Sequence, residues 1–81
     1  MNIKLEQLLE LMYANDLVEV KNFHTDKRMI YGDSNDILVF SKHIDCIVMS
    51  MYPIQNKLIV NVLNQYDYEE YKSKEGNMWL S

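Results

Sequence analysis

The sequence is short of several residue types, and each shortage excludes a class of protein. Cys46 is the single cysteine among 81 residues, so no disulfide can form within the chain and a disulfide-held scaffold is excluded. Two glycines, one proline and an apolar content of 48% do not fit a disordered or loop-rich chain. We therefore expect one folded domain, because a chain of this length has room for one hydrophobic core.

Long apolar runs are also missing. None approaches the roughly 18 residues that a membrane-spanning helix needs. Charged residues recur through residues 1–10, so this segment is unlike a signal peptide, in which a cationic stretch precedes an apolar one. We expect a soluble, cytoplasmic protein with no membrane partner.

Positive charge is scarce and scattered. Eight Lys and Arg residues oppose twelve Asp and Glu residues, for a net charge of −4. Direct binding to nucleic acid needs clustered cations, and the sequence shows no such cluster. The only glycines, Gly32 and Gly76, stand far apart, so a glycine-rich phosphate loop is absent. We expect no direct nucleic-acid binding and no nucleotide cofactor.

The first segment with a regular pattern is residues 3–14, where apolar residues recur at helical spacing. The apolar stripe consists of Leu5, Leu8, Leu9 and Met12. Asn2 is a suitable N-cap, and Asn15-Asp16 favours a turn, so the pattern predicts a helix between them.

Residues of strand type dominate the middle of the chain. The strands predicted from alternation and β-branched content are 17–23, 28–31, 45–52 and 58–63. Short polar loops at 24–27 and 53–57 join them into two antiparallel hairpins. Between the hairpins, capping residues Ser34 or Asn35 favour a short helix to about Lys42, although Ile37–Ser41 also permits a strand.

These elements predict an α+β domain over residues 1–63. An N-terminal helix packs on a four-stranded antiparallel sheet made of two hairpins, with a short central helix and a short C-terminal helix or tail. If a helix covers only one face of the sheet, the apolar residues Phe23, Ile59 and Leu63 on the other face would be exposed to water unless something else covers them. Trp79 and Leu80, a partner protein or a second copy of the chain are candidates to cover them.

Residues 64–81 form an acidic, tyrosine-rich extension that we expect to pack on the domain. Asp67 can cap a short helix that ends at Gly76. Tyrosine is enriched at binding surfaces, and interspersed carboxylates complement a basic partner. The candidate partner-binding residues are Tyr66, Asp67, Tyr68, Glu69, Glu70 and Tyr71. The alternative interpretation, compatible with the first, is that tyrosines pack on the sheet while the charges face water.

Catalytic and metal-binding patterns are weak. His43 and Cys46 have a spacing typical of metal ligands, but a zinc site needs at least three protein ligands and the only other histidine is His24. The same residues with Asp45 do not make a catalytic triad, because neighbouring strand residues point to opposite faces. We expect no metal and no nucleophilic catalysis.

Two carboxylate pairs, Asp33 with Asp36 and Glu69 with Glu70, have the composition needed for acid–base chemistry. Both pairs lie in segments predicted to be exposed, where burial does not tune the pKa of a carboxylate. Helix capping and solvation explain them better. We therefore expect a protein that is not an enzyme and has no cofactor.

The first 63 residues resemble a group of known proteins. The matching segments are Leu5-x-x-Leu8-Leu9, Leu17-Val18-Glu19-Val20 and Arg28-x-x-Tyr31-Gly32-Asp33-x-x-Asp36-Ile37. In size, composition and element order, residues 3–63 resemble small phage and prophage proteins of Gram-positive bacteria. The resemblance implies the order αββαββ and no catalytic residues. It also implies a role against host defence, as in anti-CRISPR proteins, which block nucleic-acid-binding surfaces.

The leading functional hypothesis is therefore a non-enzymatic protein-binding module. It would be a phage-encoded inhibitor of a host defence or nucleic-acid enzyme, acting in the host cytoplasm on a partner with a basic nucleic-acid-binding surface. One alternative is a structural or regulatory homo-oligomer, such as a homodimer joined through an open sheet face. Another is a protein that sequesters a small molecule, such as a nucleotide signal, through Arg28 with Lys21 or Lys42.

Overall fold

A computed structural model describes residues 3–12 and 16–80, with the backbone alone described for Phe40 and residues 75–80. Several predicted features lie outside this description: the N-cap Asn2, the helix stop at Asn15, and the side chains of Trp79 and Leu80. In chain order the elements are α1 (Leu5–Glu10), β1 (Leu17–Asn22), β2 (Arg28–Asp33), α2 (Ser34–Phe40), β3 (Ile47–Ile54), β4 (Lys57–Leu63) and α3 (Gln65–Leu80).

The four strands form one mixed sheet in the order β2-β1-β4-β3. Both predicted hairpins are confirmed, because β1–β2 and β3–β4 are antiparallel. The prediction of an entirely antiparallel sheet is wrong, since the central strands β1 and β4 run parallel. The connection formed by residues 34–46 is long enough to carry the chain back along the sheet, so β3 starts at the same end of the sheet as β2 and runs parallel to it. Because β1 is antiparallel to β2 and β4 is antiparallel to β3, β4 runs parallel to β1.

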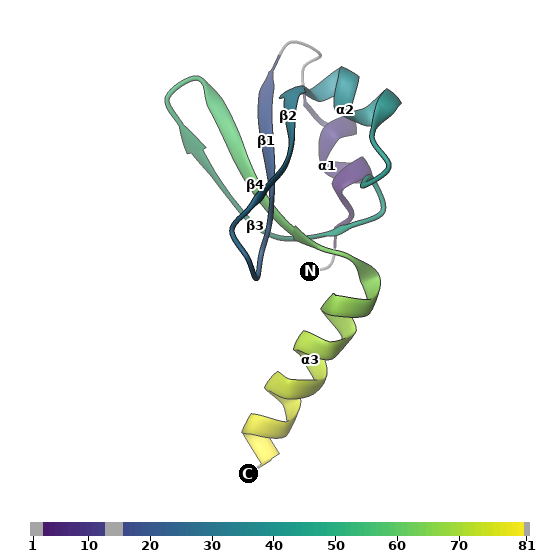
Figure 1. Cartoon of the computed structure of the whole chain (residues 1–81), viewed down its shortest axis with the longest axis vertical. Helices are drawn as coiled ribbons and strands as arrows, with labels where there is room; N and C mark the ends of the chain where they lie inside the picture. Colours follow the sequence, from purple (N-terminus) through teal and green to yellow (C-terminus); the bar gives the residue numbers. More distant parts are fainter. Residues whose placement is uncertain (1–2, 13–15, 81) are drawn as a thin grey trace.

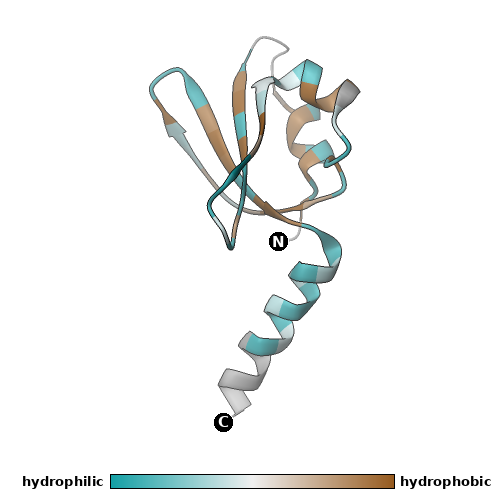
Figure 2. Ribbon diagram, in the orientation of Figure 1, coloured by the Kyte–Doolittle hydropathy of each residue, from teal (hydrophilic) through white to brown (hydrophobic). Residues whose placement is uncertain are grey.

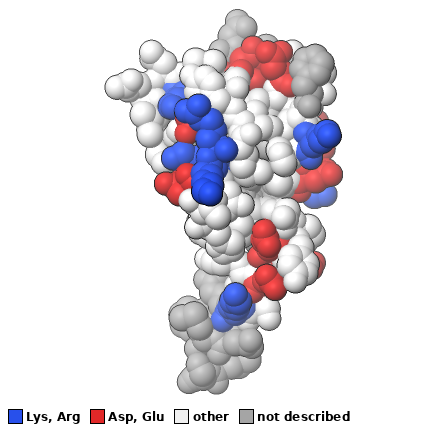
Figure 3. Space-filling model, in the orientation of Figure 1, with Lys and Arg blue, Asp and Glu red and all other residues white. Residues whose placement is uncertain are grey.

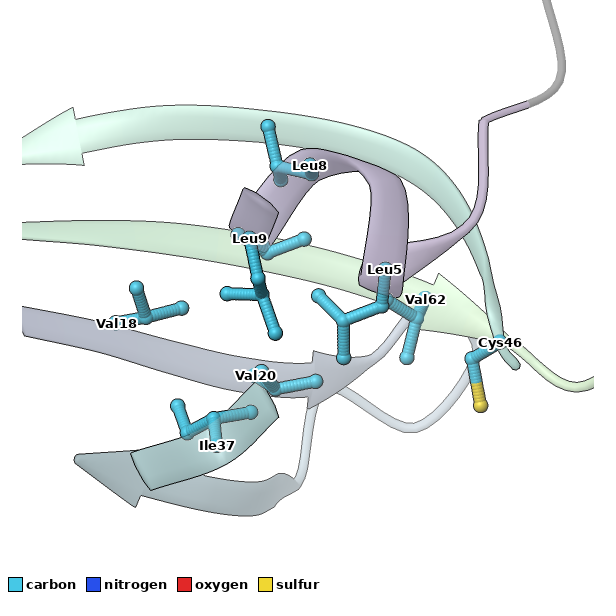
Figure 4. Close-up of a cluster of buried hydrophobic side chains, with 9 residues drawn as sticks. Leu5, Leu8, Leu9, Val18, Val20, Ile37, Cys46 and Val62 are labelled. Carbon is cyan, nitrogen blue, oxygen red and sulfur yellow. The ribbon is translucent and has the colours of Figure 1, made fainter. Parts of the chain in front are cut away.

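Both α1 and α2 cover one face of the sheet (Figure 1), so the central helix shares the covering role predicted for the N-terminal helix alone. The core between helices and sheet takes alternate residues of β1 and β4, as the period of two predicts. Figure 4 shows this cluster, which consists of Leu5, Leu8, Leu9, Val18, Val20, Ile37, Cys46, Val60 and Val62.

The first helix is confirmed but is shorter than predicted, since α1 begins after Lys4 and ends at Glu10 rather than at residue 14. The next N–H groups, those of Leu11 and Met12, bond to carbonyl oxygens three residues back. Such bonds tighten the last turn into a 3₁₀ geometry and end the helix.

The ambiguous segment Ile37–Ser41 is helical up to Phe40, within α2. Its cap is Asp33, whose carboxylate accepts a hydrogen bond of 2.8 Å from the backbone N–H of Asp36. The prediction that Ser34 or Asn35 caps this helix is therefore wrong. A capping carboxylate at the helix start also interacts favourably with the helix dipole.

Strand β3 departs from simple alternation. Simple alternation would place Val48, Ser50 and Tyr52 on one face of the sheet. The register with β4 shifts between Val48 and Ser50, so Ser50 and Tyr52 lie on the face opposite to Val48. A bulge of one residue reverses the facing of all later side chains. The strand also includes Pro53, which is tolerated because β3 is an edge strand.

The C-terminal helix is longer than predicted. It begins after Asn64, whose side-chain oxygen accepts a hydrogen bond of 2.8 Å from the N–H of Asp67, so Asn64 rather than Asp67 is the cap. It continues past Gly76 to Leu80. Figure 1 shows α3 leading away from the body of the molecule, and Figure 2 shows mostly hydrophilic residues along the part whose side chains are described.

Candidate binding surfaces

The sheet face opposite α1 and α2, which we call the open face, is organised in rows of residues paired across the strands. Three rows, each in the order β2-β1-β4-β3, are Asp33–Leu17–Lys57–Ile54, Tyr31–Glu19–Ile59–Tyr52 and Arg28–Lys21–Asn61–Ser50. Paired residues in a sheet point to the same face, so each row is a line of neighbouring side chains. The open face therefore combines charged, amide and aromatic groups.

The start of α3 covers the end of the open face beyond these rows. Tyr68 is 9% exposed and packs against Ile47 and Leu63. Tyr71 lies edge-on to Phe23, with ring centroids 5.6 Å apart and an interplanar angle of 87°. These two tyrosines therefore cover apolar residues of the sheet, one of the two interpretations that the sequence allows, and the edge-on ring geometry is a favourable one.

The opposite side of α3 faces solvent. Tyr66 is 69% exposed, and Glu69 and Glu70 are also exposed. The Tyr66 hydroxyl donates a hydrogen bond of 3.2 Å to Glu70 Oε1, and the charge of Glu70 raises the pKa of Tyr66. Gln65 Nε2 donates to Glu69 Oε1 at 3.2 Å. These i, i+4 contacts hold both carboxylates along one side of the helix.

The six predicted partner-binding residues are thus divided by the helix. Tyr68 and Tyr71 point to the sheet, whereas Tyr66, Glu69 and Glu70 form an exposed surface that we call the α3 outer face. Asp67 is half-buried in the first turn, where a negative charge favours the helix dipole.

The second surface joins Arg28 and Lys21, the cations that the sequence indicates for a small-molecule site, with three residues that were not predicted. On the open face, the Glu19 carboxylate receives Lys57 Nζ at 2.7 Å and Arg28 Nη2 at 3.2 Å, both on Oε1. Lys21 Nζ lies 3.9 Å from Oε2, and it also lies 3.4 Å from Asp26. The exposed ring of Tyr31 lies beneath two of these cations. We call Glu19, Lys21, Arg28, Lys57 and Tyr31 the Glu19 cluster.

The electrostatics of this cluster are dominated by its one central carboxylate. The Glu19 side chain is only 6% exposed, because its cationic partners cover it near the surface of the sheet. The hydrogen bond from Lys57 lowers the pKa of Glu19 below its usual value, and the charges of Arg28 and Lys21 lower it further against the opposing effect of desolvation. Glu19 is therefore held as a carboxylate that fixes the positions of three cations.

This arrangement predicts a pH-dependent contribution to stability that Glu19→Gln removes. Because the pKa is lowered on folding, the contribution is complete above the ordinary value of 4.5 and is lost as the pH falls through the folded-state pKa. We expect wild type to be more stable than Glu19→Gln at neutral pH, and the gap to narrow in acid. Urea unfolding across the acid range measures this. Glu10→Gln, on the exposed end of α1, controls for loss of any carboxylate.

The residues considered for metal binding or nucleophilic catalysis do not assemble into a site. Cys46 is buried, and its desolvation raises the pKa of the thiol, which disfavours the reactive thiolate. His43 and Asp45 are exposed, and the contact of His43 with Cys46 is a backbone hydrogen bond of 3.1 Å from Cys46 N to His43 O. Across residues 3–12 and 16–74, no three His, Cys, Asp or Glu side chains are placed to hold a metal ion.

Comparisons with known proteins give no match: no protein-family model, curated protein or solved structure matches the chain. Within the part of the chain that the structure describes, no helix is both long and apolar enough to cross a membrane.

Proposed function

We propose that the protein is a non-enzymatic binding module that docks on a basic protein surface through the α3 outer face. The observation that supports this proposal is the division of α3. Tyr68 and Tyr71 anchor the helix on the sheet, and Tyr66, Glu69 and Glu70 are left exposed on a helix that leads away from the body (Figure 1).

The chemistry of this surface fits a cationic partner. The exposed tyrosine is a residue type enriched at protein interfaces, and the two adjacent carboxylates give electrostatic complementarity to positive charges on a partner. Figure 3 shows Asp and Glu side chains along the first turns of α3 and a Lys or Arg side chain only farther along the helix. The described lysines of the helix, Lys72 and Lys74, follow the acidic residues by about a turn, so negative charge is concentrated near the sheet.

We further propose that the partner is a host defence or nucleic-acid enzyme whose nucleic-acid groove is basic, and that the protein is a phage-encoded inhibitor acting in the host cytoplasm. Carboxylates on a rigid helix can occupy positions that phosphates take in such a groove, which excludes the nucleic acid by competition. The resemblance to small phage proteins supports the same conclusion as an analogy.

The test is the double charge reversal Glu69→Lys/Glu70→Lys. We expect at least roughly tenfold weaker binding to an RNA-guided or restriction nuclease that wild type binds, because like charges then face each other across the interface. The same variant should lose inhibition of DNA cleavage. Titration by biolayer interferometry at two salt concentrations measures both the affinity and its ionic component.

The matched control is Asp36→Lys/Asp45→Lys, which changes net charge equally at exposed positions outside α3. Circular dichroism verifies that both variants are folded. Equal loss of binding in the two variants would show a non-specific effect of net charge. Unchanged binding in the α3 variant would remove the outer face from the interface.

A further inference from the structure

The three positive side chains of the Glu19 cluster exceed the negative charge around them. Lys21, Arg28 and Lys57 contact two carboxylates, those of Glu19 and Asp26, which leaves one positive charge in excess. In Figure 3 Lys and Arg side chains gather over the β1–β2 side of the sheet. Three of the eight basic residues, scattered in the sequence, are thus brought together by the fold.

One of these cations is well placed to bind an added anion. The Arg28 side chain is 59% exposed, and its described hydrogen bond to Glu19 uses Nη2 alone, although a guanidinium has five N–H donors. Its Cζ atom lies 5.1 Å from the centre of the Tyr31 ring, so the group is held against the sheet. A fixed guanidinium with donors directed to solvent is suited to phosphate, which it binds in a bidentate manner.

A hollow with different chemistry lies beside these cations on the open face. It has a volume of about 310 Å³, close to the lower limit of ordinary ligand sites, and it opens to solvent. Its lining residues are Leu17, Tyr31, Ile54, Gln55, Asn56 and Lys57. The lining therefore offers an aromatic ring and two aliphatic side chains to a flat apolar ligand, and two amides that can both donate and accept hydrogen bonds.

Lys57 and Tyr31 belong to both features, so the hollow and the cations form one continuous surface. Lys57 lines the hollow, reaches Glu19 at 2.7 Å and lies 5.3 Å from the centre of the Tyr31 ring. We propose that this surface is a nucleotide site, in which the base lies in the hollow against Leu17 and Ile54, beside the amides and the edge of the Tyr31 ring. The phosphate contacts Arg28 and Lys57, the two cations that lie over the face of that ring.

The size of the surface limits the ligand to one or a few nucleotides. Double-stranded DNA binds through many phosphates along its length, and three clustered cations on a chain of net charge −4 do not supply that many contacts. Stacking on an exposed ring with a nearby cation is instead the way proteins bind single nucleotides and single strands. Free nucleotide and the nucleotides of a single strand share this chemistry.

The experiment is a titration of the ¹⁵N-labelled full chain followed by NMR, with AMP, inorganic phosphate, adenosine and a short single-stranded oligonucleotide as separate probes. We expect saturable shifts from AMP at the amides of Tyr31, Gln55, Asn56 and Lys57, with weaker effects from phosphate or adenosine alone. If AMP saturates the site, a free nucleotide is a sufficient ligand. If only the oligonucleotide saturates it, the ligand is a single strand.

Two variants test the assignment at its charged and aromatic contacts. Arg28→Gln should weaken AMP binding by roughly tenfold, the value of one charge-assisted contact. Tyr31→Leu should also weaken AMP binding by roughly tenfold, because it removes the ring edge beside the base and the ring face that holds Arg28 and Lys57 in place. Lys42→Gln, an exposed lysine in the loop after α2, is the matched control for Arg28→Gln.

Failure of this proposal is distinguishable from failure of the protein-binding proposal. Glu69→Lys/Glu70→Lys should bind AMP as wild type does, because those residues face away from the open face. The nucleotide proposal is overturned if no probe gives saturable shifts in the hollow at millimolar concentration. It is also overturned if Lys42→Gln weakens binding as much as Arg28→Gln.

Discussion

Replacing Leu5 with alanine is expected to lower the free energy of unfolding by about 2–5 kcal/mol, the range for a fully buried leucine. The Leu5 side chain is 0% exposed and lies in the core between α1 and the sheet (Figure 4). The substitution keeps the backbone N–H of residue 5, which bonds to Cys46 O at 2.8 Å, so the loss reports the buried side chain. In a chain this small, each kcal/mol lowers Tm by roughly 4–8 °C.

The same substitution at Leu11 is the control, because that side chain is 81% exposed at the end of the same helix. We expect Leu11→Ala to change stability by no more than about 0.5 kcal/mol. Urea unfolding followed by circular dichroism compares the two variants. Similar losses in both would contradict the assignment of Leu5 to the buried core, because alanine has a helix propensity at least as high as that of leucine.

Replacing Tyr68 with alanine is expected to lower the free energy of unfolding by about 3 kcal/mol, as for other buried aromatic residues. Tyr68 is the most buried described residue of α3, and it covers Leu63 and Ile47, which are themselves buried. With the ring removed, α3 loses its main contact with the sheet. We therefore expect a larger effect on hydrogen exchange in α3 than in the sheet, in addition to the lower stability.

Tyr66→Ala provides the matched control on the same helix, two residues away and 69% exposed. Its stability should stay close to wild type. Its partner binding should weaken if the α3 outer face is the interface, so the two tyrosines separate anchoring from recognition. Retention of full stability by Tyr68→Ala would contradict the assignment of Tyr68 as the anchor of α3.

The two proposed surfaces are separate in space and opposite in charge. The α3 outer face is acidic and lies on a helix leading away from the body, whereas the Glu19 cluster is basic and lies on the open face. A protein partner and a nucleotide can therefore be tested independently. The alternative hypothesis of a homodimer joined through the open face is tested by light scattering, which measures the mass of the particle in solution.

Local patterns determined much of this fold. The apolar stripe beginning at Leu5 predicts a helix, and the alternation of Val18 and Val20 with Glu19 predicts which residues of β1 face the core. Both signals depend on neighbours within one element, so the sequence alone carries them. The same is true of the hairpins, whose strands are joined by short polar turns.

Tertiary structure decided the relations between distant segments. The return of the chain across residues 34–46 sets the parallel pairing of β1 and β4, and that pairing places Lys57 beside Glu19, 38 residues away. Alternation places Glu19 on the face opposite to Val18 and Val20, but it does not indicate which other residues lie on that face. The helix in the tail is similar: composition predicts a tyrosine-rich acidic surface, but only docking on Leu63 determines that Tyr68 is inside and Tyr66 outside.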